Sequence, residues 1–357
     1  MTAVSSTDTA EETHKHNLAG IRIWLYAICF LVFIMVIIGG VTRLTDSGLS
    51  ITEWKPLLGA IPPLSEAHWL EEFEKYQKIP EYQLQNKGMS LAEFQFIYWW
   101  EWGHRFFGRL IGLAFFVPFV WFAVRKAIPK PLYPKLIVLF VLGGLQGFVG
   151  WWMVYSGLSV RVDVSQYRLA THLTLAFFIF AVTMWVARGL RNSAAQGRYQ
   201  LVGTSVFWTS RALLALLFVQ LFAGGLVAGL DAGLTYNTWP LMDGDFVPSG
   251  LLSDAPGGLL NAFENIQTVQ FNHRVVAYAV LALALFHVLQ IAKNTGGIAT
   301  ATATIVALAI LMQALIGIVT LLLVVPLWAG VLHQGFAVIV LAVTVVHVQN
   351  LRRQPKQ

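Results

Sequence analysis

The residues best suited to chemistry in this chain are four histidines at matching points of long apolar stretches. They are His104, His172, His273 and His333. Each is predicted to lie within a few residues of the outer end of a hydrophobic helix. Ionisable side chains within membrane segments are rare and by default indicate function. A lone histidine near a helix end is more often a hydrogen-bonded structural residue, but four at matched depth predict two pairs of ligands.

Two histidines on facing helices of a bundle are a standard way to hold a heme iron. Zinc sites usually need three or four grouped ligands, and each half of this chain offers only two. The one cysteine, Cys29, excludes an intrachain disulfide and a cysteine-rich metal site. The pattern therefore predicts one heme with paired axial histidines in each half.

The two halves differ three residues before the first histidine of each pair. Glu101 precedes His104, whereas Gln270 precedes His273. Residues at i and i+3 share a helix face, so either side chain can approach the ligand or its heme. A carboxylate can accept a proton or stabilise a developing cation, and an amide can do neither. We expect a catalytic first half and a supporting or electron-transfer second half. The alternative is that Glu101 only favours the helix start through the dipole.

Three arginines accompany these histidines. Arg105 and Arg274 directly follow their histidines, and Arg109 lies one turn deeper. Guanidinium groups pair with carboxylates in a bidentate manner, so these arginines are candidate partners for heme propionates. Snorkelling towards lipid phosphate groups is the alternative.

A further histidine follows 14 residues after each ligand of the second pair. His287 and His347 lie on nearly the same helix face as those ligands, about 21 Å away. This spacing is that of a second, inner heme. The first half has Pro118 and Val186 at the equivalent positions. We favour the interpretation that both histidines are interfacial residues near the cytoplasmic helix ends.

Composition places these residues in a membrane. Of 357 residues, 57% are apolar and 12% charged, and the mean hydropathy is +0.64. These values exclude a soluble enzyme, a disordered chain and a nucleic-acid-binding module. The net charge of +6 lies at the ends of apolar runs, where it sets orientation. Eight segments are long enough to span about 30 Å of hydrocarbon: 21–41, 104–124, 135–155, 169–188, 207–230, 272–292, 300–323 and 327–348.

An internal repeat groups these segments in fours. GGVTRLTDSGLSITEW at 39–54 recurs as GGLVAGLDAGLTYNTW at 224–239, and EWGHR at 101–105 recurs as QFNHR at 270–274. Four helices per half give both halves the same orientation. The predicted fold is an all-α membrane protein with eight transmembrane helices. They form two tandem four-helix bundles related by a pseudo-twofold axis along the membrane normal.

Two smaller motifs also recur. Asp46 and Asp231 stand in DxGL sequences just outside the first and fifth segments. The glycine suits a turn with positive φ and the aspartate can cap it, so we expect loop closures over the outer site. Gln146 and Gln313 are each followed four residues later by a glycine, a small residue that allows close helix packing.

Lysine and arginine counts set the orientation. They are frequent between the second and third segments, between the fourth and fifth, and in the C-terminal tail, and absent from 231–270. Both termini are therefore predicted to be cytoplasmic, with the histidine sites towards the outer face. No signal-peptide or transit pattern is present, which favours a bacterial cytoplasmic membrane. The predicted divisions are a tail at 1–20, a first repeat at 21–190 with an outer loop at 42–100, a linker at 191–206, a second repeat at 207–350 and a tail at 351–357.

The chain resembles the heme A synthase family across residues 20–350. The resemblance rests on EWGHRFFGR at 101–109, THL around His172, NHR around His273 and HQG at His333. It implies oxidation of the C8 methyl group of heme O to a formyl group. Two hydroxylations followed by loss of water would give heme A for cytochrome c oxidase.

The resemblance also assigns roles to residues. It implies that His104 and His172 serve the substrate heme, that His273 and His333 ligate a heme b, and that Glu101 is the essential acid. Some bacterial members carry cysteine pairs in outer loops, and this chain has none. It therefore resembles the cysteine-less alphaproteobacterial and mitochondrial form, and a cysteine-based mechanism is excluded.

The implied partners are heme O, membrane lipid, heme O synthase, cytochrome c oxidase assembly factors and a second copy of the chain. Two other classes fit parts of the pattern. A membrane electron-transfer b-type cytochrome would contain only heme b and would not convert heme O. A transporter is compatible with two parallel repeats, but its ionisable residues would lie at the midplane and not at the outer ends.

Overall fold

The computed structural model describes residues 6–55, 58–158, 161–190, 199–251, 257–295 and 297–354, with side chains from residue 16 onward. The predicted linker and tails therefore fall partly outside the described residues, at 1–5, 191–198 and 355–357. The basic residues counted there for orientation also lie outside them.

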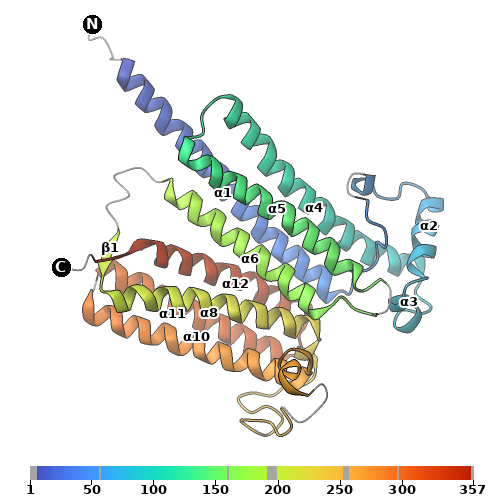
Figure 1. Ribbon diagram of the computed structural model, residues 1–357. Helices are drawn as coiled ribbons and strands as arrows, with labels where there is room; N and C mark the ends of the chain where they lie inside the picture. Colours follow the sequence, from blue (N-terminus) through green and yellow to red (C-terminus); the bar gives the residue numbers. More distant parts are fainter. Residues whose placement is uncertain are drawn as a thin grey trace.

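Eight helices among the described residues are long and apolar enough to cross a membrane, which confirms the predicted fold class. Figure 1 shows them running side by side. They are α1 (Ser6–Leu44), α4 (Leu91–Val124), α5 (Tyr133–Tyr155), α6 (Gln166–Gly189), α8 (Thr204–Gly229), α10 (Ile266–Asn294), α11 (Gly297–Leu322) and α12 (Leu327–Asn350).

Helix α4 begins well before the predicted segment. Ser90 and Glu93 form a capping box at its start, in which each side chain bonds the backbone of the other residue. The residues that follow are polar or amphipathic, so a window for apolar runs does not detect this outer part of the helix. His104 therefore lies well inside α4, not near its outer end as predicted. The other three ligand candidates lie about two turns into α6, α10 and α12.

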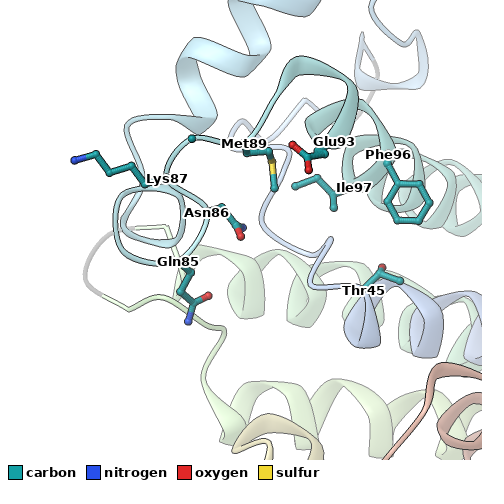
Figure 2. A pocket seen from close by; sticks show the side chains of 9 residues that line it. Thr45, Gln85, Asn86, Lys87, Met89, Glu93, Phe96 and Ile97 are labelled. Carbon is teal, nitrogen blue, oxygen red and sulfur yellow. The ribbon is translucent and has the colours of Figure 1, made fainter.

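The long outer loop folds into a compact unit, which we call the outer cap (residues 58–90). The sequence HWLEEFEKYQKIPEY at 68–82 predicts one polar interfacial helix in this loop. The structure has two helices there instead, α2 (Glu66–Tyr76) and α3 (Pro80–Leu84). Ile79, just before Pro80, is extended at φ −86° and ψ 157°, because proline disfavours helical geometry in the preceding residue. The cap packs Phe73 and Tyr76 against Phe94 of α4. A cavity of about 620 Å³ opens between the cap and the outer end of α1 (Figure 2).

Helix contacts fall into two groups joined by a long interface (Figure 1). Helices α1, α4, α5 and α6 contact one another, and so do α8, α10, α11 and α12. The groups meet where α6 packs on α8 and where α12 packs on α1 and α6. At the first of these contacts, a Cβ on Gly225 would lie 2.6 Å from the Cα of Ala170, and one on Gly229 would lie 2.5 Å from the Cα of Gln166. Glycines four residues apart therefore allow the two backbones to approach.

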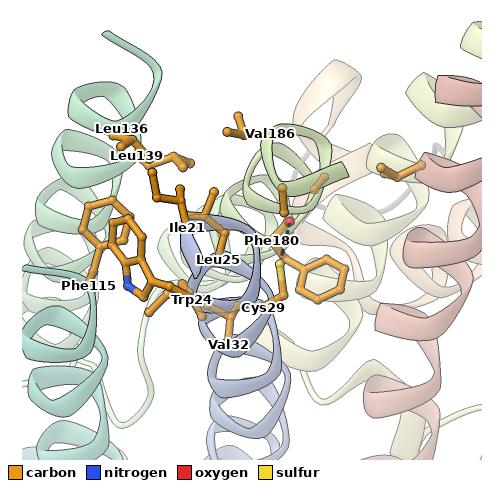
Figure 3. Packing of buried hydrophobic residues seen from close by; sticks show 14 of the residues in the cluster. Ile21, Trp24, Leu25, Cys29, Val32, Phe115, Leu136, Leu139, Phe180 and Val186 are labelled. Carbon is orange, nitrogen blue, oxygen red and sulfur yellow. Dashed lines mark hydrogen bonds between the residues drawn. The ribbon is translucent and has the colours of Figure 1, made fainter. Parts of the chain in front are cut away.

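The largest buried cluster lies in the first group, around the part of α1 nearer its N-terminus (Figure 3). The rings of Trp24 and Phe115 lie 5.0 Å apart, and the Trp24 indole donates to the carbonyl of Ala114 over 2.9 Å. Leu341 of α12 also joins this cluster. The indole thus combines apolar burial with a satisfied donor, and one core spans both groups of helices.

Two short strands pair where the two helix groups connect. β1 (Gln200–Val202) runs parallel to β2 (Leu351–Arg353). No sequence pattern predicts strands this short. The pairing fixes the segment before α8 to the segment after α12. The remaining described elements are η1 (Leu58–Ala60), η2 (Lys130–Leu132), η3 (Ala232–Leu234), η4 (Gly258–Leu260) and α9 (Asn261–Glu264).

Candidate functional site

Each of the four candidate ligands packs its ring against a glycine on a neighbouring helix. A Cβ built on that glycine would lie 2.7–3.2 Å from the nearest imidazole atom, which is closer than real Cβ atoms comfortably approach. Because glycine has only a hydrogen atom in place of a side chain, it leaves room for each imidazole ring. The four pairs are Gly39 with His104, Gly150 with His172, Gly224 with His273, and Gly317 with His333.

Three of the four rings are also held by a glutamine located four residues before the glycine. The Nε2 atoms of Gln146, Gln220 and Gln313 lie 3.2, 3.1 and 3.2 Å from Nδ1 of His172, His273 and His333, in that order. Two of these glutamines were expected only to mark close helix packing. Gln220 was not predicted, although its spacing from Gly224 repeats the same pattern.

The fourth ring has a different neighbour. Met35 stands four residues before Gly39, where the other three sites carry glutamine. Its methyl group lies 3.4 Å from the position of a Cβ on Gly108. The repeat position that carries an amide beside His273 is therefore occupied by a flexible apolar side chain in the first half.

The structure brings the candidate ligands together in the predicted pairs. His104 and His172 are close enough to interact electrostatically, and so are His273 and His333. Within the part of the chain that the structure describes, no group of three or more His, Cys, Asp or Glu residues could hold a metal ion. Two-histidine sites are thus the arrangement present in each half.

Three buried oxygen atoms test whether these residues fit a heme. Oε1 of Gln146, Gln220 and Gln313 is buried without a hydrogen-bond partner, although buried polar atoms are nearly always paired. A histidine that binds iron through one ring nitrogen presents the other as an N–H donor, which a neighbouring acceptor orients. In all three amides Nε2 faces the ring, and turning the amide over would present the unpaired Oε1 as such an acceptor. Both rings of the second pair and His172 of the first pair therefore have a neighbouring group suited to an iron-bound histidine, whereas His104 has none among the described residues.

Glu101 lies next to the first pair and is buried, with 2% of its surface exposed. Its Oε2 accepts hydrogen bonds from the Ser50 hydroxyl at 2.8 Å and the Ile51 amide at 2.7 Å. Its Oε1 accepts from Nη2 and Nε of Arg105 at 2.6 and 3.0 Å. Four donors fix this carboxylate in one orientation, as electrostatic preorganisation requires.

Gln270 occupies the equivalent place in the second half with reversed polarity. Its Oε1 accepts from Arg274 at 3.0 Å, which matches the glutamate–arginine pair. Its Nε2, however, donates to the carbonyl of Ala232 at 2.7 Å. The first pocket therefore presents donors to a carboxylate, whereas the second presents an acceptor to an amide. A negative charge is accommodated only in the first.

The three arginines are held largely by protein groups. Besides Glu101, Arg105 donates to the carbonyls of Ile51 and Glu53, and Arg109 donates to that of Lys55 at 3.1 Å. Arg274 donates to the carbonyls of Tyr236 and Thr238. Arg105 and Arg109 both line a cavity of about 310 Å³ under the outer cap. Their pairing with propionates stays a prediction.

The recurring aspartates close the outer loops differently from the expectation. The residues with a left-handed backbone conformation are Asp46 and Asp231 themselves, at φ 49° and 50°. The glycines two positions later do not have it. Aspartate is one of the few residues with a side chain that adopts this conformation readily. Arg43 bonds Asp46 at 2.8 Å and Asp231 at 2.7–2.8 Å. This arginine, which sequence reasoning missed, joins the two halves at their outer ends and has an alanine, Ala228, at its repeat position.

The third pair of histidines, near the other ends of α10 and α12, is buried among the helices. His287 and His347 expose 1% and 0% of their surfaces, and their Nε2 atoms lie 2.9 Å apart. Thr209 and Thr302 bond the two Nδ1 atoms at 2.8 Å. A metal bound by both rings in line would need its two nitrogens about 4 Å apart, twice a typical bond of about 2.0 Å. The inner-heme alternative does not fit this arrangement, and the pair is a hydrogen-bonded link between four helices.

The fold and these sites define a class: multi-pass α-helical membrane proteins with two paired-histidine sites near one end of the helices. The chain belongs, within this class, to the family of cytochrome oxidase assembly proteins described by the COX15-CtaA model, which matches residues 22–345. The motif-based resemblance is thereby confirmed.

Relatives named heme A synthase match nearly the whole chain. The protein of Parvibaculum lavamentivorans is 51% identical over 353 residues, which covers 99% of this chain and 100% of the relative. That of Azorhizobium caulinodans is 52% identical over 94% of this chain and 95% of its own. That of Chelativorans sp. is 52% identical over 93% and 91%.

Proposed function

We propose that this protein is a heme A synthase, an oxidoreductase that converts the C8 methyl group of heme O to a formyl group. The names of its relatives support the substrate and the product. The observation that carries the assignment to particular residues is the contrast between Glu101, held by four donors, and Gln270, whose amide donates to a carbonyl. One half has the means to handle protons and positive charge, and the other lacks it.

In this proposal the two histidine pairs have different occupants. His104 and His172 hold the substrate heme O, and His273 and His333 hold a resident heme b. Heme b would supply a one-electron redox centre. The glutamine–glycine pairs that support three of these rings would orient them, and Met35 leaves His104 without that support.

In the first half, Glu101 would be the catalytic residue. In this proposal each hydroxylation would remove two electrons and a proton from the C8 carbon and add a water molecule, which releases a second proton, and an external one-electron oxidant would take the electrons in two steps. Two such hydroxylations give a geminal diol, and loss of water from it leaves the formyl group. A carboxylate at the reacting carbon stabilises positive charge as it develops and accepts the proton. Ser50, Ile51 and Arg105 hold that carboxylate in place throughout.

The location and divisions follow the same proposal. Residues 21–190 form the substrate half and 207–350 the heme b half, in a bacterial inner membrane with both termini cytoplasmic. Basic residues near the β1–β2 end support this orientation: Arg188 bonds Gln349 and Asn350 there. The prenyl tail of heme O favours delivery through lipid. Heme O synthase would supply the substrate, and cytochrome c oxidase assembly factors would receive the product.

The alternative of an electron-transfer b-type cytochrome has no use for the Glu101 site. Such a protein needs two hemes and a path between them, so both halves would serve equally well with glutamine at this position. The asymmetric hydrogen bonding therefore favours the enzyme.

The experiment that tests the proposal is Glu101→Gln in protein produced with a supply of heme O. We expect the variant to keep heme b and heme O and to form heme A at least tenfold more slowly, because the amide cannot accept the proton. Gln270→Ala in the second half is the matched control and should still yield heme A. Heme A formation at the normal rate in Glu101→Gln would contradict the proposal.

A further inference from the structure

A second carboxyl is buried above Glu101 and has no role in the function proposed so far. Glu81 lies in α3 of the outer cap and exposes 3% of its surface. Its Oε2 is buried without a hydrogen-bond partner. A buried carboxylate with an unpaired oxygen is costly when charged, so this group needs a reason to be there.

The groups that face Glu81 come from four parts of the chain. Tyr76 of α2 forms a side-chain hydrogen bond with it, and the charges acting on it most strongly are Glu101 of α4, Asp46 after α1 and Asp163 before α6. Burial, followed by the neighbouring charge of Glu101, raises the pKa of Glu81 from its ordinary 4.5 to about 8. The two buried carboxyls are thus electrostatically coupled, and the outer one holds a proton at neutral pH.

A polar route connects Glu81 with the outside. Asn86 donates to the Tyr76 hydroxyl at 2.8 Å and lines the cavity of about 620 Å³ between the cap and α1. Figure 2 shows Asn86 on the cap side of this cavity and Thr45 on the opposite side. Exposed Gln85 and Lys87 border it, so it reaches solvent.

The same cavity comes near Glu101 only through Ile97, and neither Glu101 nor Glu81 lines it. Ile97 lines it one helical turn before Glu101, and the Ser50 hydroxyl that bonds Glu101 lies 3.4 Å from the carbonyl of Ile97. Glu101 itself is enclosed by four donors and nearly inaccessible. A proton taken up there needs an intermediate group before it reaches water.

We propose that Glu81 is a proton-relay residue that acts through Glu101 and discharges protons into the outer cavity. The inference rests on the proposed function and deepens it. Glu81 first releases its proton through the Tyr76 hydroxyl, which it bonds, towards water in the cavity that Asn86 lines. It then accepts the proton that Glu101 took from substrate, which restores the Glu101 carboxylate. Each transfer moves one proton between two oxygen atoms and needs no oxidant.

The test compares Glu81→Gln and Glu81→Asp with wild type. Glutamine preserves the shape and neutrality of the protonated acid but carries no exchangeable acid proton, so a merely structural role would survive it. We expect Glu81→Gln to retain both hemes and to form heme A about tenfold more slowly. Its rate should lack the rise with pH near 8 that we expect for wild type. Glu81→Asp should recover much of the rate with this rise displaced in pH.

A matched control is Glu66→Gln, which neutralises an exposed acid on α2 of the same cap and should change neither rate nor pH profile. An unchanged rate and pH profile in Glu81→Gln would overturn the relay. Where that variant does not accumulate as folded protein, Glu81→Asp decides, since a pH profile identical to wild type excludes Glu81.

A second readout needs no turnover. Infrared difference spectra of the intact protein across pH should show a carboxylic acid carbonyl band that titrates near pH 8. The band should be absent from Glu81→Gln and displaced in Glu81→Asp. If Glu81→Gln still shows a carboxylic acid band that titrates near pH 8, the inference is overturned. If wild type forms no heme A while the Glu81 band titrates as expected, the proposed function fails and not the acid assignment.

Discussion

At the scale of residues, the two halves differ in the hydrogen bonds around one side chain: the Ser50 hydroxyl and the Ile51 amide donate to Glu101, whereas Gln270 donates to the carbonyl of Ala232. Glu101 and Gln270 stand at the same place in a repeated sequence, beside equivalent arginines. The surrounding backbone nevertheless presents an amide N–H to the first and a carbonyl to the second. Each pocket is therefore complementary to the side chain it contains, and exchanging the two side chains would leave like groups facing each other.

The glycines behind the histidine rings give a prediction for each half. Gly150→Ala places a methyl group 2.9 Å from the ring of His172, and Gly317→Ala places one 2.7 Å from that of His333. Because the rings must move, we expect the first variant to lower heme O occupancy and the second to lower heme b occupancy. Pyridine hemochrome spectra with chromatography of the extracted hemes measure both. Gly144→Ala, where nothing lies within 4 Å, is the control, and equal loss of both hemes in either test variant would contradict independent sites.

The pKa of Glu81 predicts a pH dependence of stability. The folded protein keeps this proton up to about pH 8, whereas the unfolded chain releases it near 4.5. Stabilisation by the bound proton is therefore complete below about pH 4.5 and is lost as pH rises to about 8, by up to about 1.4 kcal/mol for each pH unit. The thermal unfolding temperature of wild type should fall more steeply with rising pH over this range than that of Glu81→Gln. Parallel curves for the two proteins would refute the shifted pKa.

At the scale of elements, the closest helix contacts depend on glycine residues, whose side chain is a single hydrogen atom. The α6–α8 contact has Gly225 and Gly229 against backbone atoms of Ala170 and Gln166. Backbone cannot move aside as a flexible side chain can, so added volume there must separate the helices.

Gly225→Val should therefore destabilise the junction of the two halves by about 1–3 kcal/mol or more. Thermal unfolding in detergent, followed by circular dichroism, measures the effect. Gly203→Val, at a position with open space just before α8, is the control. A transition temperature of Gly225→Val equal to that of wild type would show that the helices do not meet as described.

Much of the element order is predictable from apolar length alone, and the failures have physical causes. The first 13 residues of α4 escaped detection because they are polar or amphipathic and pack under the outer cap rather than in lipid. The prediction of a single helix from 68 to 82 failed because Pro80 keeps the preceding residue, Ile79, out of helical geometry. The pairing of β1 with β2 depends on two segments about 150 residues apart along the chain, which no local pattern reveals.

The candidate site was predictable to a similar degree. Repeat matching identified the four candidate ligands, and Glu101 was found by its contrast with Gln270 beside a matched histidine. Gln220 and Arg43 were missed because each has a non-matching partner in the other half, Met35 and Ala228. The burial of His287 and His347 was also missed, since the threonines that satisfy both rings lie on other helices.

At the scale of the whole molecule, the two halves form similar frames around unlike chemistry. Shared core packing, the Arg43 bridge between Asp46 and Asp231 and the strand pair hold the halves together. Within them, one site has a carboxylate, an outer cap and a buried second acid, and the other has an amide. The proposed division between an oxidised substrate heme and a resident heme follows from this asymmetry.

The most direct test of that division is the heme composition of the wild-type protein purified from cells that supply heme O. Acid extraction and chromatography with mass detection identify each heme. We expect heme b together with heme O, a hydroxylated intermediate or heme A, which would show two unlike sites and oxidation of the methyl group. Heme b alone in the presence of abundant heme O would contradict it and would favour an electron-transfer cytochrome.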